Sequence, residues 1–122
     1  MGVFIGIFAA AGWLGVAAAS RAQDAAVVNS RTVHVTLDND RVRVFEAVLK
    51  PGDQEQPHSH PASLVYVIEG GKVRNHAANG AITEAELHPG DTSYREPITT
   101  HWAENVGTTT IRLIVVEFKT PR

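Results

Sequence analysis

Two histidines and a glutamine recur at every second position in the middle of the chain, as Gln56, His58 and His60. Alternate residues of a β-strand point to the same face, so a strand here would bring two imidazoles and an amide together. Neutral imidazole is a common ligand of divalent metals. Residues 52–60 are therefore interpreted as a strand that carries part of a metal site. Gln56 would be a further ligand, a residue that orients the ligands, or an ordinary amide on the strand rim.

The segment after these histidines is typical of a buried strand. Residues 64–69 are mostly β-branched, aromatic or aliphatic, and Gly70 and Gly71 indicate a turn. Tyr66 is in phase with His60, so we expect its side chain to point inward. There it would be a hydrogen-bond donor or a redox-active phenol beside the metal, or an ordinary tyrosine of the core.

The rest of the chain is a series of strand patterns separated by short turns. Asn79-Gly80 is a strong hairpin signal, and the last pattern is apolar on both faces, as in a central strand. No segment longer than a turn has helical periodicity. The patterns cover residues 32–37, 41–49, 72–76, 81–87, 92–96 and 110–119. They predict an all-β sandwich or barrel.

One acidic residue lies among the valines of the second pattern. Glu46 shares a strand face with Val42, Val44 and Val48. An unpaired buried carboxylate is unfavourable, so the preferred interpretation is a rim residue paired with an arginine. The alternative is a carboxylate close to the metal.

A second polar stretch, residues 88–105, completes a pattern that begins at Gly52. The order and spacing of the residues in the two stretches resemble the two motifs of the cupin family. The first motif contains glycine, the pair H-x-H, a glutamate and a second glycine; the second contains glycine, proline, glycine, histidine and asparagine. The positions that match are Gly52, His58, His60, Gly71, Gly90, His101 and Asn105.

This resemblance implies a small double-stranded β-helix, or jelly roll, over residues 32–122, with His101 as the third histidine ligand. Three motif positions differ, because Glu96 takes the place of the proline, Ile98 that of the inner glycine, and Leu64 that of the glutamate ligand. Without the glutamate, three neutral imidazoles would hold the metal. Such a nitrogen site favours copper, which heads the affinity order of divalent metals, with iron or zinc as alternatives.

An open copper site in a barrel suits one-electron chemistry with dioxygen or peroxide. The chain resembles small secreted cupins that oxidise cellulose with copper, which implies an extracellular polysaccharide or small-molecule substrate. The alternatives are a non-catalytic cupin that binds a sugar or a metal, and an iron or zinc dioxygenase or isomerase that acts on a small metabolite. Tyr94, Arg95 and Glu96 lie before His101 in sequence and are candidate substrate contacts, or ordinary polar residues of a strand.

Length and composition predict a single domain. The chain has 122 residues, of which 43% are hydrophobic, enough for one modest core. The formal net charge is −2, without the basic surface that nucleic acid or an anionic membrane would require. Cysteine is absent, which excludes disulfides and thiolate metal sites.

The N-terminus has the pattern of a secretory signal peptide. Residues 3–19 are apolar, and Ser20 and Ala22 provide the small residues of a cleavage site. We expect a signal peptide over residues 1–22, a loose leader over 23–31, and a secreted or periplasmic protein without stable membrane association after cleavage. A membrane anchor that is not cleaved is the alternative.

A homodimer is expected from the apolar residues that would face outward. Trp102 is out of phase with His101 and should point away from the metal. Val65 and Val67 are out of phase with the inward face assigned to Tyr66. Together with the last strand, these residues would form a patch larger than a soluble monomer usually exposes.

Overall fold

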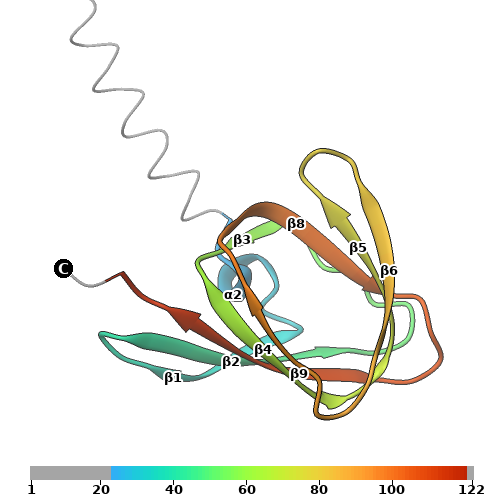
Figure 1. Ribbon diagram of the computed structural model, residues 1–122, viewed down its shortest axis with the longest axis horizontal. Coiled ribbons are helices and arrows are strands. Elements are labelled where there is room, and N and C mark those ends of the chain that lie inside the picture. The colour runs from blue at the N-terminus through green and yellow to red at the C-terminus, as the bar shows by residue number, and fades with distance from the viewer. Residues whose placement is uncertain (1–22, 121–122) are drawn as a thin grey trace, which may run out of the picture.

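The computed structural model describes residues 23–120 and consists of two antiparallel β-sheets that face each other (Figure 1). The larger sheet has the strand order β1-β2-β9-β4-β7, and the smaller has the order β3-β8-β5-β6. The elements are α2 (Ala25–Val28), β1 (Val33–Asp38), β2 (Val42–Leu49), β3 (His58–His60), β4 (Ser63–Glu69), β5 (Gly71–Ala77), β6 (Ile82–Leu87), β7 (Thr92–Arg95), β8 (Ile98–Asn105) and β9 (Ile111–Phe118). The all-β jelly roll predicted from the sequence is confirmed.

The core lies between the sheets and follows the two-residue period of the strands. In β2, Phe45, Ala47 and Leu49 are buried while the residues between them are half-buried. The last strand, β9, pairs with β2 on one side and β4 on the other, which confirms its predicted central position. Its residue Val115 aligns with both Phe45 and Val65, so three strands contribute neighbouring side chains to one apolar layer.

The inward face of β4 is the opposite of the one expected. Val65 and Val67 are buried between the sheets, whereas Tyr66 is exposed on the outer face. The expectation carried the phase of His60 through to β4, but Pro61 and the residue after it separate the two strands, which belong to different sheets. The chain turns between them, so the phase is not preserved. The expectations of an inward Tyr66 and of outward Val65 and Val67 were therefore wrong.

Residues 23–31 are ordered, and the expectation of a loose leader was wrong. Asp24 caps α2, because its side chain accepts a hydrogen bond of 2.9 Å from the amide of Ala26. Ala25 is fully buried, and Asp24 forms a parallel bridge with Ser59 of β3. A helix of four residues is too short to produce a periodic pattern, which is why it was not predicted. Figure 1 shows α2 close to β3. The predicted signal peptide, residues 1–22, lies outside the described residues.

Glu46 lies on the outer face of the larger sheet, where its carboxylate pairs with Arg112 of β9. The predicted pairing with an arginine is confirmed, although Glu46 lies on the outer face of β2 and not on the barrel rim. Within residues 23–120, no helix is long and apolar enough to cross a membrane.

Asn105, at the end of β8, joins three parts of the fold. Its amide nitrogen donates to the carbonyl oxygens of Leu49 at 2.8 Å and Thr109 at 2.7 Å. Its side-chain oxygen accepts from the amide of Gly107 at 3.0 Å. The residue is 2% exposed, so water does not replace these partners. The side chain thus holds the end of β2 against the turn between β8 and β9.

We predict that Asn105→Ala lowers the free energy of unfolding by about 2 kcal/mol, because two carbonyl groups lose their donor. Urea unfolding monitored by circular dichroism measures this change. Asn79→Ala is the matched control, since Asn79 is exposed in a hairpin turn and its side chain accepts from the amide of Ala81. A loss for Asn105→Ala no larger than for the control would contradict the assignment.

Candidate metal centre

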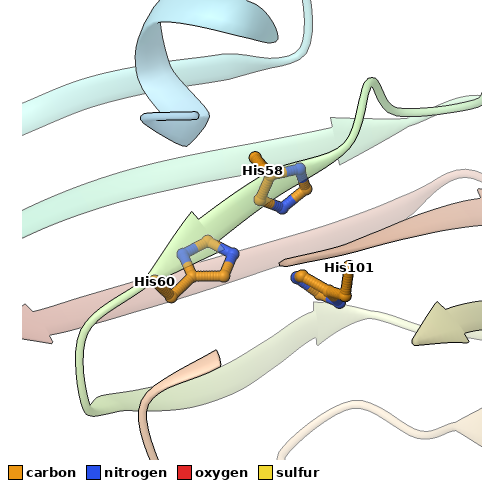
Figure 2. A group of neighbouring side chains, drawn as sticks. All are labelled: His58, His60 and His101. Carbon is orange, nitrogen blue, oxygen red and sulfur yellow. The ribbon is translucent and has the colours of Figure 1, made fainter. Parts of the chain in front are cut away.

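Three imidazole rings meet at one end of the space between the sheets (Figure 2). His58 and His60 come from β3, and His101 comes from β8, where it is the register partner of His58. The ring centroids are 4.6 to 5.1 Å apart. One nitrogen from each ring lies within 4.8 Å of the others. The predicted cluster is therefore present, and the alternation of β3 produces the shared face of His58 and His60 as expected.

Hydrogen bonds from outside the cluster orient each of the three rings. In every case the Nδ1 atom lies beside an oxygen that can accept its proton, although the Nδ1 of His58 also lies 3.1 Å from the amide nitrogen of Asn29. The pairs are His58 with the carbonyl oxygen of Gln56 at 2.7 Å, His60 with Glu117 Oε2 at 2.7 Å, and His101 with Asn75 Oδ1 at 2.9 Å. A proton on Nδ1 leaves a free electron pair on Nε2. This arrangement is typical of histidines that bind a metal through Nε2.

The Nε2 atom of His101 is buried and has no hydrogen-bond partner within the described part of the chain. Protonation does not stabilise it, because burial and the neighbouring His58 and His60 lower the pKa of His101 to about 3. Burial also lowers the pKa of His58. Neutral imidazole is the form that binds metals. A buried nitrogen without a partner is unfavourable, so the three residues fit a metal ion that would accept their electron pairs.

The cluster opens into a cavity of about 280 Å³ between the two sheets. Most of its wall is aliphatic, with side chains from both sheets. The apolar lining includes Leu49, Val65, Val73, Leu87, Ile111 and Leu113. The polar groups are few and include Glu55, Asn75 and Arg95 next to the histidines. A metal at this position would therefore face a small and largely apolar chamber.

Residues 45–117 match the family described as the cupin domain. The chain belongs to the cupin family. A cupin domain from Bordetella pertussis has 25% identity and a TM-score of 0.67, with 72% of this chain and 92% of that chain covered. A Klebsiella pneumoniae protein with a double-stranded β-helix domain has 28% identity and a TM-score of 0.57, over 69% and 72% of the two chains. A predicted oxalate decarboxylase from Thermotoga maritima has 19% identity and a TM-score of 0.55, over 72% and 79%. A comparison with curated protein sequences finds no match.

The carboxylate that supports this cupin site comes from β9. Leu64, at the position of the family's glutamate, is on the outer face of β4 and has no part in the site. Glu117, which is the register partner of Ser63, is buried and accepts from His60 Nδ1. Glu117 therefore orients His60 and is not itself one of the candidate metal ligands. Glu117 could have been noticed in the sequence, because it is the one acidic residue of an apolar strand and is in phase with the buried Ile111 and Val115.

An ion-pair network continues from Glu117 to the N-terminal segment. Arg43 donates to Glu117 Oε1 through Nε at 2.9 Å and Nη2 at 2.7 Å, and its two terminal nitrogens contact Asp24 at 2.8 Å each. Burial acts to raise the pKa of Asp24, but the hydrogen bonds from Arg43 and from the amide of Ala26 hold it below its usual range. The arginine thus keeps Glu117 in position behind His60.

Glu55 is a second carboxyl group that sequence reasoning did not identify. Its Oε1 accepts from the amide of Ala103 at 3.0 Å and lies 3.9 Å from Nε2 of His58. Burial raises the pKa of Glu55 to about 7, although the Ala103 amide and Arg95 act in the opposite direction. Glu55 was missed because it is out of phase with His58, and the two-residue period applies only to β3 itself.

Of the other candidate residues of this cupin, some contact the histidines or the cavity, and the rest are exposed away from it. Gln56 contributes through its backbone, because its side chain is exposed and its carbonyl oxygen contacts His58. Tyr66 and Tyr94 lie on the outer face, 41% and 58% exposed, and Glu96 is also exposed. Of the candidate substrate contacts, only Arg95 lines the cavity. None of the exposed side chains is close to the metal ligands, so their expected roles there are not supported.

Trp102 faces away from the cavity, as expected from its phase relative to His101. Its ring stacks on His76 with centroids 3.6 Å apart and an interplanar angle of 3°. His76 in turn contacts Glu104 on the outer side of the smaller sheet. The tryptophan is therefore packed against an outer-face residue and not against the metal centre.

The N-terminal segment holds the strands that carry the ligands. Asn29 is buried, and its side chain accepts from the amide of Gln56 at 2.7 Å and donates to the carbonyl oxygen of the same residue at 3.2 Å. The backbone oxygen of Gln23 accepts from the amide of Ser59, and its side-chain oxygen accepts from Thr100 Oγ1. Residues 23–29 thus contact both β3 and β8 beside the histidines.

We predict that Glu117→Gln weakens metal binding about tenfold, because the substitution removes the negative charge that fixes the Nδ1 proton of His60. Competition with a chelator of known affinity measures this change, and the melting temperature shows whether the variant is folded. Glu104→Gln is the matched control, since Glu104 accepts from His76 on the outer face. An affinity of Glu117→Gln within twofold of the unaltered protein would contradict the role assigned to Glu117.

Proposed function

We propose that this cupin is a mononuclear metal-dependent oxidoreductase that acts on a small molecule inside the barrel, with copper as its metal. The observation that carries the proposal is the geometry of His58, His60 and His101. All three rings have a hydrogen-bond acceptor at Nδ1, which leaves their Nε2 atoms for one ion. The buried Nε2 of His101, without a partner in residues 23–120, supports the same conclusion.

The donor atoms favour copper over harder metals. The cluster within the described residues contains three imidazoles and no carboxylate. Neutral nitrogen ligands suit copper, nickel and zinc, and copper binds most tightly among the divalent first-row metals. Bound copper supplies one-electron exchange with dioxygen or peroxide. Iron and zinc remain the alternatives, and export through the predicted signal peptide would favour the metal that binds most tightly outside the cytosol.

The cavity favours a small molecule over a polysaccharide. Its volume of about 280 Å³ lies near the lower end of the range for small-molecule sites. A sugar chain presents many hydroxyl groups, and each needs a hydrogen-bond partner when it leaves water. The aliphatic wall offers few such partners. The small-molecule alternative for the substrate is therefore the one we propose.

The protein's own residues would bind the substrate and exclude water. The aliphatic wall removes water from around a bound molecule, which strengthens the polar contacts that remain. Glu55 lines the cavity, and its Oε1 is held by the Ala103 amide. Arg95 lies in the same region and supplies a positive charge.

Metal content and copper EPR test this proposal. We predict one copper ion per chain after loading, with nitrogen hyperfine splitting in the EPR spectrum. His101→Ala should weaken binding at least a hundredfold, because the centre loses one of its three ligands and is left with an incomplete coordination shell. His34→Ala is the matched control, since His34 is exposed on β1. A protein that binds no metal would refute the proposal, and one that binds copper without turnover of any small molecule would support a non-catalytic binding protein.

We also propose a homodimer, formed through the outer face of the larger sheet. Five apolar residues align in register across all five strands of this face: Leu37, Val44, Val116, Leu64 and Tyr94. The Arg112–Glu46 and Lys119–Asp38 pairs accompany them on the same sheet. An apolar row of this extent, accompanied by charges of both signs, is suited to a second copy of the same surface.

We predict a dimer by light scattering at micromolar concentration. Leu64→Lys should convert it to a monomer, because the lysine would be placed in the middle of the apolar row. Ile82→Lys is the control, since Ile82 is an exposed apolar residue of the other sheet. A monomer for the unaltered protein, or a dimer for Leu64→Lys, would contradict this interface.

A further inference from the structure

Arg95 brings a positive charge into the cavity at the end of β7. It is the register partner of Ser63, whose side chain is buried on the inward face of β4. Glu117 is the partner of Ser63 on the other side. The three residues therefore form one row on the inner face of the larger sheet, with Arg95 on the edge strand. This position places the guanidinium group among the cavity-lining residues next to His101 and Glu55.

Arg95 has no ion-pair or side-chain hydrogen-bond partner in residues 23–120. The arginines Arg43, Arg74 and Arg112 each pair with two carboxylates. Glu55 is the acidic residue beside Arg95 in the cavity, but the two do not form an ion pair, and Oε1 of Glu55 is occupied by the amide of Ala103. Burial lowers the pKa of Arg95, and Glu55 only partly opposes this effect. A partly buried guanidinium group without a partner is unfavourable until an anion binds it.

The aliphatic part of the cavity lining is suited to a hydrocarbon. Val65 and Leu113 come from the larger sheet, and Val73 and Leu87 come from the smaller sheet. Their side chains provide no hydrogen-bond donors or acceptors, so a polar body would lose its contacts with water without replacement. The cavity therefore combines a cation and the three histidines with a lining that is otherwise mostly apolar.

We infer that the substrate is a small organic carboxylate with an apolar body. Its carboxylate would accept hydrogen bonds from the planar guanidinium group of Arg95, a geometry that favours two parallel bonds. Its hydrocarbon part would lie against the aliphatic wall, and the atoms near the carboxylate would face the three Nε2 atoms. This inference rests on the proposed function, because it names the substrate class of the same cavity.

Calorimetric binding of hexanoate and of its neutral analogue hexanamide tests the inference. Both ligands are measured with metal-free protein and with zinc-loaded protein, since zinc has no redox chemistry of its own. We predict one hexanoate per chain, bound at least tenfold more tightly than hexanamide in both forms. Arg95→Gln should abolish this preference, so that hexanoate and hexanamide bind with similar affinity. Arg95→Lys keeps the positive charge but lacks the planar guanidinium group that can donate two parallel hydrogen bonds. It should retain only part of the preference for hexanoate.

Two controls accompany these variants. Arg74→Gln removes an arginine from the outer face of the smaller sheet, where it pairs with Glu84, and should leave hexanoate binding unchanged. Melting temperatures show whether Arg95→Gln and Arg95→Lys are folded. Equal binding of hexanoate and hexanamide, no binding of hexanoate at millimolar concentration, or a preference that persists in folded Arg95→Gln would overturn the inference.

The same measurements separate this inference from the proposed function. If the protein bound no metal but still preferred hexanoate through Arg95, the oxidoreductase would be refuted and the carboxylate site would stand. If copper bound to the three histidines and Arg95 conferred no preference, the metal centre would stand and the substrate class proposed for it would be wrong.

Discussion

The geometry of the candidate metal centre depends on hydrogen bonds to the Nδ1 atoms of its three histidines. An imidazole that rotates or exchanges its tautomer presents a proton to the metal instead of an electron pair. The Gln56 carbonyl, Glu117 and Asn75 provide the acceptors that prevent this. They come from the loop before β3, from the centre of the larger sheet and from β5. The geometry of the centre is therefore a property of both sheets and cannot arise from β3 and β8 alone.

The apolar cavity and the buried ion pairs depend on each other. Glu117 is a buried charge and Arg43 a half-buried one, and they stabilise each other as a hydrogen-bonded pair. Asp24 adds a second carboxylate to Arg43, so the network begins at the edge of the protein and ends at His60. The aliphatic side chains around the histidines exclude water and make each of these contacts stronger. The network holds His60 at the edge of a largely apolar cavity.

Much of the fold could be predicted from residue patterns, because alternation within a strand and spacing between histidines are local properties. His58 and His60 follow from strand alternation, and so does the central position of β9, whereas His101 is assigned from the resemblance to the cupin motifs. The orientation of Tyr66 does not, because Pro61 separates two strands that belong to different sheets, and a phase cannot be counted across that break. Glu117 and Glu55 reach the site through tertiary pairing and an irregular loop. Their roles depend on contacts between distant parts of the chain, which a single sequence does not display.

The position of Gln23 has a practical consequence for any work with the purified protein. This residue hydrogen-bonds to Ser59, between two ligands on β3, and to Thr100, next to the third ligand on β8. An affinity tag or fusion partner joined at Gln23 would add chain at the point where the two ligand-bearing strands meet. A tag at the other end would follow β9 at Phe118, which is exposed on the outer face. The terminus that carries the tag can therefore affect the measured metal content of the protein.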